Sequence, residues 1–190
     1  MTTWCQDRKI VLRHPIRVIP GLDLSDLNSV QTFAEQFVSE ETGLDILINN
    51  AGVVADNFAK SPQGHEIMLA TNHLGVFHLT NLLLPLLKHN QPSRIINLSS
   101  DAHYMYTYTL ADLLYEFEVP LGTSLGLNQV MKKYAQTKTA NVLHLLELTR
   151  IFKEEGTQIT TYAVHPGAVN TNLGSSEENS KGFIQRWILP

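Results

Sequence analysis

The chain has 190 residues, of which 43% are hydrophobic and 17% charged, and its formal net charge is −4. This length and composition predict one globular domain covering residues 1–190. The scattered charges exclude the basic surface of a nucleic-acid-binding protein, and the single Cys5 excludes an intrachain disulfide.

No stretch is expected to cross a membrane, because Asn81 and Pro85 interrupt the most apolar run, at residues 79–87. The first ten residues also lack the apolar stretch of a signal peptide. We therefore expect a cytoplasmic protein. The 8 histidines show no spacing such as HExxH, so no metal site is predicted.

The first predicted helix covers residues 25–42, where apolar side chains recur at helical spacing. Ser25 is its expected N-cap, and Gly43 is expected to end it. The run LDILIN at residues 44–49 follows, and it is typical of a strand buried on both faces of a parallel sheet.

The next predicted helix covers residues 62–88 and starts at the serine–proline pair 61–62. A second buried strand is predicted at RIINLS, residues 94–99. A third helix at residues 129–154 and a strand at residues 158–164 complete the pattern. Strands that alternate with helices predict an α/β fold with a parallel sheet.

The segment between Ser100 and Tyr134 is long for a connection inside a domain, and it is rich in aromatic residues. These side chains could line an apolar pocket or simply pack the segment onto the domain, and the sequence leaves both interpretations open. They are Tyr104, Tyr106, Tyr108, Tyr115 and Phe117.

Small and polar residues follow each predicted strand: NNAG at 49–52, a serine pair at 99–100 and HPG at 165–167. Open parallel sheets bind ligands at the carboxyl ends of their strands. In the third helix Tyr134 stands four residues before Lys138, so both side chains share one face. That spacing alone is weak evidence, because it also arises by chance.

Six segments in this order resemble the short-chain dehydrogenase/reductase family. They are LDLSDL at 22–27, NNAG at 49–52, TNHLG at 71–75, INLSS at 96–100, YAQTK at 134–138 and HPGAVNT at 165–171. Within the family, GHEIMLATNHLGVFHLTNLLLPLL and KTANVLHLLEL resemble the retinol dehydrogenase group and the oxidoreductase domain of the WW-domain-containing oxidoreductase. The resemblance implies a Rossmann-like doubly wound parallel sheet.

The resemblance also implies four catalytic residues. Tyr134 would be the general acid/base toward a carbonyl or alcohol, and the Lys138 cation, joined by the positive charge of an oxidised nicotinamide, would lower its pKa. Ser100, preferred to Ser99, would donate to the substrate oxygen as charge develops there. Asn72 would anchor a water molecule that links Lys138 to solvent.

An NADP or NAD cofactor is implied, with NADP preferred. Its adenine would meet residues 23–24, its adenosine ribose residues 50–52, and its nicotinamide end the residues after the last strand. The implied cofactor-binding residues are Asp23, Leu24, Asn50, Ala51, Gly52, Tyr134, Lys138, Pro166, Gly167, Val169 and Thr171. Plainer interpretations remain: a serine cap, turn glycines, and a helix asparagine with a local partner.

One family feature is missing: the glycine-rich turn TGxxxGxG that holds the pyrophosphate. The first glycine here is Gly21 and the next is Gly43. The chain is therefore expected to start just before the family's third strand, at residues 16–24, and to stop before its last helix and strand. In such a fold, truncated at both ends, the strand at residues 44–49 becomes an edge.

Two functions are compatible with this pattern. The first is an oxidoreductase that transfers hydride between NAD(P) and a small lipophilic alcohol or carbonyl compound, such as a retinoid or steroid. The alternative is a catalytically inactive truncated isoform or pseudoenzyme that binds a partner protein. In the family, helices equivalent to 62–88 and 129–154 commonly form a homodimer interface, and full-length relatives are often membrane-anchored.

Overall fold

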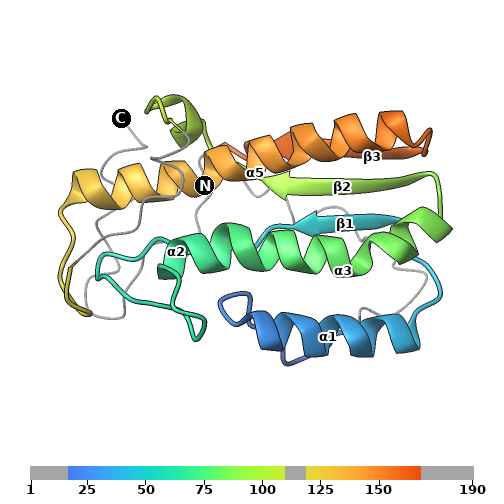
Figure 1. The fold of residues 1–190 in the computed structure, drawn as a ribbon, viewed down its shortest axis with the longest axis horizontal. Helices are drawn as coiled ribbons and strands as arrows, with labels where there is room; N and C mark the ends of the chain where they lie inside the picture. Colours follow the sequence, from blue (N-terminus) through green and yellow to red (C-terminus); the bar gives the residue numbers. More distant parts are fainter. Residues whose placement is uncertain (1–16, 110–118, 168–190) are drawn as a thin grey trace, which may run out of the picture.

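The computed structural model describes residues 17–109 and 119–167, in which helices and parallel strands alternate as predicted. Figure 1 shows the elements in chain order. They are α1 (Leu27–Glu40), β1 (Ile46–Asn49), α2 (Ile67–Leu69), the π turn η1 (Ala70–Leu74), α3 (Gly75–His89), β2 (Ser93–Leu98), the 3-10 turn η2 (Asp101–Tyr104), α5 (Leu127–Glu154) and β3 (Ile159–Val164).

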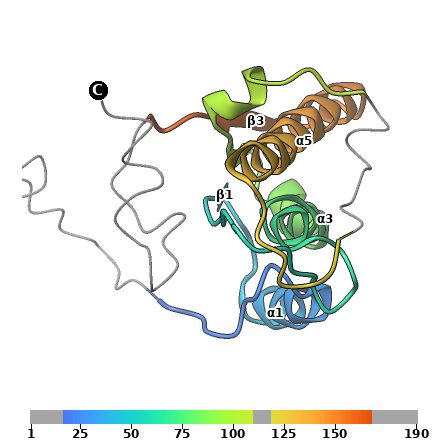
Figure 2. The same cartoon turned by 90° about the vertical axis from the view of Figure 1, so that its left-hand side faces the viewer.

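The three strands form a parallel sheet in the order β1-β2-β3. Ile96 of β2 stands opposite Ile48 of β1 on one side and Tyr162 of β3 on the other. Helices α1, α3 and α5 lie together on one side of this sheet (Figure 2). The main core lies between β2, β3 and the helices α3 and α5; its buried residues are Leu87, Ile95, Leu145, Leu148, Phe152 and Ile159.

Strand β1 is an edge strand within the described part of the chain, as predicted. The expectation that both of its faces are buried is wrong, because Ile46 is 42% and Ile48 58% exposed. Leu47, on the opposite face, packs against the core. Among the described residues the helices cover one face of the sheet, so Ile46 and Ile48 on the other face meet solvent.

The strand expected at residues 16–24 is not formed by its described part. Residues 17–22 carry no strand hydrogen bonds, and Val18 is 83% exposed. A strand is stable only when a neighbour satisfies its backbone groups. Without such a neighbour among the described residues, β-favouring side chains alone do not make this segment a strand.

Helix α1 begins and ends inside its predicted limits. Asp26, and not Ser25, is the N-cap, because its carboxylate accepts the N–H of Asn28 over 3.0 Å. The helix ends at Glu40, so Gly43 lies beyond it and does not form the expected C-terminal stop. Two adjacent residues with capping side chains made the position of the start ambiguous.

The second helix begins at Ile67, five residues later than predicted. The carboxylate of Glu66 caps it by accepting the N–H groups of Met68 and Leu69 over 3.0 and 2.9 Å. Pro62 lies in the preceding turn and not at the first helical position.

The helix formed by α2, η1 and α3 bears on the membrane prediction. Ile67–His89 is long enough to cross a membrane, and its most apolar 18-residue stretch, with a mean hydropathy of 1.3, is 50% buried in the protein. By length and composition alone this helix is a candidate span, which the sequence interpretation did not include. A core helix of a soluble domain passes the same test, and Leu83 and Leu87 of this helix belong to the core.

Two of the aromatic side chains that precede α5 pack onto that helix. The hydroxyl of Tyr106 donates to Oδ1 of Asn128 over 3.1 Å, and that of Tyr108 donates to the carbonyl of Lys132 over 2.7 Å. Tyr104 is 81% exposed. These contacts favour the packing interpretation for Tyr106 and Tyr108; the other two aromatics, at positions 115 and 117, lie outside the described residues.

Candidate active site

The predicted acid/base pair lies on the buried face of α5, where this helix passes the carboxyl end of β2. Tyr134 and Lys138 are one helical turn apart and only 8% and 4% exposed. The Ser99–Ser100 pair directly follows β2. The fold therefore brings together three side chains that lie up to 38 positions apart in the sequence, since 138 − 100 = 38.

Ser100 and Tyr134 are in side-chain hydrogen-bond contact. Burial raises the pKa of the Tyr134 phenol, and the hydrogen bond to Ser100 opposes this effect. Ser100 also caps η2, where its hydroxyl oxygen accepts the N–H of Ala102 over 3.2 Å. Both the proposed catalytic role and the plainer capping role of Ser100 thus have a geometric basis.

The ammonium group of Lys138 lies 5.4 Å from the centre of the Tyr134 ring and donates to the carbonyl of Leu98 over 2.9 Å. Desolvation lowers the pKa of Lys138 to about 8. Burial raises the pKa of Tyr134 in this structure, and the expected lowering by Lys138 together with an oxidised nicotinamide stays a prediction. The phenol and the cation are both desolvated, so burial opposes charge on each of them.

Ser99 has a structural position. Its side chain is 5% exposed, and its hydroxyl donates to the main-chain carbonyl of Lys138 over 3.2 Å. This bond ties the end of β2 to α5. Ser99 therefore helps to hold the Lys138 segment, while Ser100 contacts the Tyr134 phenol.

Asn72 lies in the π turn η1 and is 1% exposed. Its amide binds both main-chain groups of Val53, accepting the N–H over 2.7 Å and donating to the carbonyl over 2.9 Å. It also donates to Thr137 over 3.3 Å. These bonds agree with the plainer interpretation of Asn72 as an amide with local partners.

Gly52 stands between Asn72 and Lys138. A Cβ atom at this position would lie 3.3 Å from Oδ1 of Asn72 and 3.6 Å from Nζ of Lys138. Asn50 and Ala51 precede it at the carboxyl end of β1, and both are exposed. The lack of a side chain at position 52 lets the loop after β1 approach the buried lysine closely.

The loop after β3 lies beside the start of η2. Nε2 of His165 is 3.1 Å from a carboxylate oxygen of Asp101, a contact that sequence analysis did not anticipate. Pro166 and Gly167 follow and are exposed, and Gly167 has a φ of +77°, which favours glycine. The predicted cofactor contacts at positions 169 and 171 lie outside the described residues.

The segment predicted to meet adenine lies across the start of α3. The carboxylate of Asp23 accepts the N–H and the hydroxyl of Ser25 over 2.8 and 2.7 Å. A Cβ atom on Gly75 would lie 2.0 Å from the carbonyl oxygen of Leu24, so only glycine fits there. The sequence alone gave no reason to expect this role of Gly75, although the residue ends the motif TNHLG.

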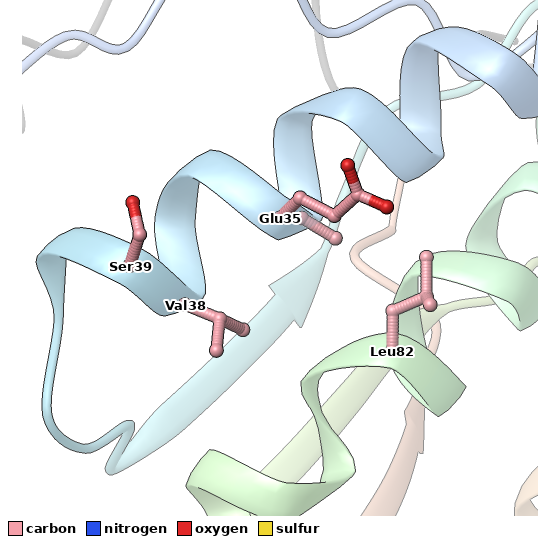
Figure 3. Close-up of a pocket in the computed structure, with 5 residues that line it drawn as sticks. Glu35, Val38, Ser39 and Leu82 are labelled. Atoms are coloured by element: carbon pink, nitrogen blue, oxygen red, sulfur yellow. The ribbon is translucent and has the colours of Figure 1, made fainter.

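A shallow groove lies between α1 and α3 (Figure 3). Glu35, Val38 and Ser39 of α1 line it together with Ala34 and Leu82. None of the predicted site residues is among them. The groove is therefore a feature of the helix layer and is distinct from the arrangement around Lys138.

The residues after β1 and β2 surround a buried cation. Lys138 donates to the main-chain carbonyl of Leu98, and a Cβ atom on Gly52 would lie 3.6 Å from its ammonium nitrogen. The glycine-rich pyrophosphate turn is not present in this sequence. No group of three or more metal-ligating side chains occurs among the described residues.

A parallel sheet with small residues at its strand ends and a serine in contact with a buried Tyr–Lys pair define an α/β oxidoreductase fold of the Rossmann type. The family model for short chain dehydrogenases matches residues 13–111. The chain belongs to this family.

Known proteins agree with this assignment. Bovine retinol dehydrogenase 12 is 47% identical over 156 residues, which are 82% of this chain and 46% of that protein. A crystal structure from Mycobacterium paratuberculosis matches with a TM-score of 0.64 and 39% identity, covering 80% of this chain and 51% of that one. The structure of NADPH-bound carbonyl reductase from chicken fatty liver matches with a TM-score of 0.56 and 25% identity, covering 82% of this chain and 59% of that one. The chain thus spans about half the length of the curated relatives it matches.

Proposed function

We propose that this chain carries the proton-transfer part of an NAD(P)-dependent dehydrogenase/reductase acting on a small lipophilic alcohol, aldehyde or ketone. The observation that carries the proposal is the buried Tyr134–Lys138 pair in contact with Ser100. The similarity to retinol dehydrogenase 12 supports a retinoid-like substrate, and the NADPH-bound carbonyl reductase supports NADP over NAD.

In this proposal each residue handles a proton or an oxygen atom. Tyr134 donates its phenolic proton to the substrate oxygen during reduction and takes it back during oxidation. Ser100 donates a hydrogen bond to the same oxygen. Lys138 holds a ribose hydroxyl and favours the phenolate electrostatically, and the nicotinamide, when bound, supplies or accepts the hydride.

The remaining cofactor contacts are also part of the proposal. Asn50, Ala51 and Gly52 would line the adenosine ribose, and Pro166 and Gly167 the nicotinamide. Asp23 and Leu24 would meet the adenine, and Val169 and Thr171 would add contacts at the nicotinamide end. Asn72, which anchors the loop at Val53, would hold a water molecule near Lys138.

The test is a titration of the purified chain with NADPH and NADH, followed by cofactor fluorescence and then by turnover of a lipophilic aldehyde. We expect binding, and we expect Tyr134→Phe to lower kcat by about 10²- to 10⁴-fold with cofactor affinity nearly unchanged. Tyr104→Phe, at a tyrosine that is 81% exposed, is the matched control. No binding at millimolar cofactor would show that this polypeptide is not itself an enzyme.

We further propose a homodimer, or a complex with a related partner, through the outer faces of α3 and α5. The observation that favours it is a set of exposed apolar side chains on these helices: Phe77 is 44%, Leu143 47% and Leu146 61% exposed. Large exposed apolar side chains gathered on one face are typical of association surfaces. The same surface would serve the alternative function, that of a catalytically inactive partner-binding protein.

A further inference from the structure

Asn141 lies on the buried face of α5, opposite the π turn η1, and is 3% exposed. Its amide nitrogen donates to the main-chain carbonyl of Asn72 over 2.9 Å. Its amide oxygen lies 2.9 Å from Nδ1 of His73. One buried side chain of α5 thus binds two consecutive residues of the turn, where water does not compete for these bonds.

The contacts of Asn141 are made to a π turn, where the hydrogen-bond register of the helix changes. The N–H of Gly75 bonds to the carbonyl of Ala70, five residues earlier, whereas the helical segments on either side use the four-residue spacing. Turns of this kind are rare and are frequently found at functional sites. A change of register within a helix alters which carbonyls have helical partners, so donors from a neighbouring helix help to fix the turn.

From the turn, the contacts lead to the proposed proton-transfer residues. The side chain of Asn72 fixes the loop after β1 through both main-chain groups of Val53. Gly52 in that loop lies so near both side chains that an added Cβ atom would be 3.3 Å from Oδ1 of Asn72 and 3.6 Å from Nζ of Lys138. A shift of η1 would therefore change the space beside the Lys138 ammonium group.

We propose that Asn141 is a positioning residue of this site, which acts by holding Asn72, and through it the Gly52–Val53 loop, beside Lys138. Its catalytic consequence rests on the proposed function. The geometry also fixes the tautomer of His73: because the nitrogen of Asn141 faces the Asn72 carbonyl, its oxygen faces His73, whose Nδ1 carries the proton.

The first test follows amide hydrogen exchange at Val53 by NMR in Asn141→Ala and in the wild type. We expect exchange at Val53 to become about fivefold faster, the size expected when a hydrogen-bonded contact worth about 1 kcal/mol is lost. Asn81→Ala, on the exposed surface of α3, is the control and should leave this rate unchanged. Unchanged exchange at Val53 in Asn141→Ala would overturn the proposal.

The second test uses Asn141→Asp, which keeps the shape of the side chain and the acceptor for His73 but removes the donor to the Asn72 carbonyl. Val53 exchange should again be faster, which keeps the proposal testable if Asn141→Ala does not fold. Nitrogen-15 NMR should show the Nδ1-protonated tautomer of His73 in the wild type and a higher His73 pKa in Asn141→Asp, because the carboxylate favours imidazolium. The opposite tautomer in the wild type would overturn the assigned geometry.

These measurements need neither cofactor nor turnover, so they remain decisive if the chain binds no dinucleotide. In that event the proposed function fails while the positioning role is still measured. Where the enzyme is active, Asn141→Asp should lower kcat with little change in KM for the substrate, because Asn141 acts through Asn72. Equal losses in Asn81→Ala would contradict a specific role for Asn141.

Discussion

At the scale of single residues, burial is the dominant influence on the candidate site. Lys138 is 4% exposed, and desolvation lowers its pKa to about 8. A lysine in this state remains mostly protonated at neutral pH but loses its charge under mildly alkaline conditions. The charge on Lys138 that the proposed mechanism requires is therefore destabilised by burial, and shifted pKa values of this kind are common at functional sites.

This penalty predicts a pH dependence of stability. The unfolded chain, with a lysine pKa near 10.5, binds more protons than the folded chain between pH 8 and 10.5, so Lys138 makes stability rise with pH across this window. Relative to Lys138→Met, the wild type should gain up to about 3 kcal/mol in free energy of unfolding. Urea denaturation at several pH values measures this difference.

Lys153→Met provides the control for the lysine prediction. Lys153 is an exposed lysine of the same helix, so its replacement should leave the pH profile of the wild type unchanged. Parallel profiles for the wild type and Lys138→Met would contradict the desolvation of Lys138.

At the scale of elements, the interface between α3 and α5 contains a second buried titratable group. His144 is 8% exposed, its two ring nitrogens have no hydrogen-bond partner, and its ring lies 4.7 Å from that of Phe77. Burial, and then the nearby His73, lower the pKa of His144 to about 4. The helix pair is thus packed around a neutral imidazole.

Acid should therefore weaken this interface. Between pH 6.5 and 4 the unfolded chain binds more protons at His144 than the folded chain, so stability is lost as the pH falls through this window. His144→Phe, which keeps a ring against Phe77, should reduce the loss by up to about 3 kcal/mol. Urea denaturation at pH 7 and at pH 4.5 measures this loss of stability. His89→Gln, at an exposed histidine, is the control. A loss in His144→Phe equal to that of the wild type would contradict this account.

At the scale of the whole molecule, α3 and α5 carry exposed apolar side chains, among them Leu143 and Leu146 of α5. If α3 and α5 form the proposed dimer, a charge at one of these positions should separate the subunits, because its burial is costly. We expect Leu146→Glu to convert dimer to monomer in light scattering coupled to size-exclusion chromatography. Leu121→Glu, at a leucine that is 68% exposed outside these helices, should leave the mass unchanged. A wild-type chain that is monomeric at high concentration would contradict the dimer.

Local patterns in the sequence were sufficient to predict the order and type of most elements. Apolar periodicity identified the three long helices and three strands, because each buries one face or both. Helix starts were less predictable, since neighbouring residues such as Ser25 and Asp26 compete as caps. The strand expected at residues 16–24 fails over its described part because pairing depends on a neighbour and not on propensity.

By itself the sequence determined the α/β fold and the family, and it predicted the Ser100, Tyr134 and Lys138 set, because these follow from motifs in a fixed order. Only the tertiary structure decided how that set is held. The close approach of Gly75 to Leu24, the position of Gly52 near Lys138 and the hydrogen bond of Asn141 to the π turn join segments far apart in the chain. The tertiary structure also decided the burial that opposes charge on Tyr134 and Lys138, since desolvation depends on what surrounds a side chain and not on its neighbours in sequence.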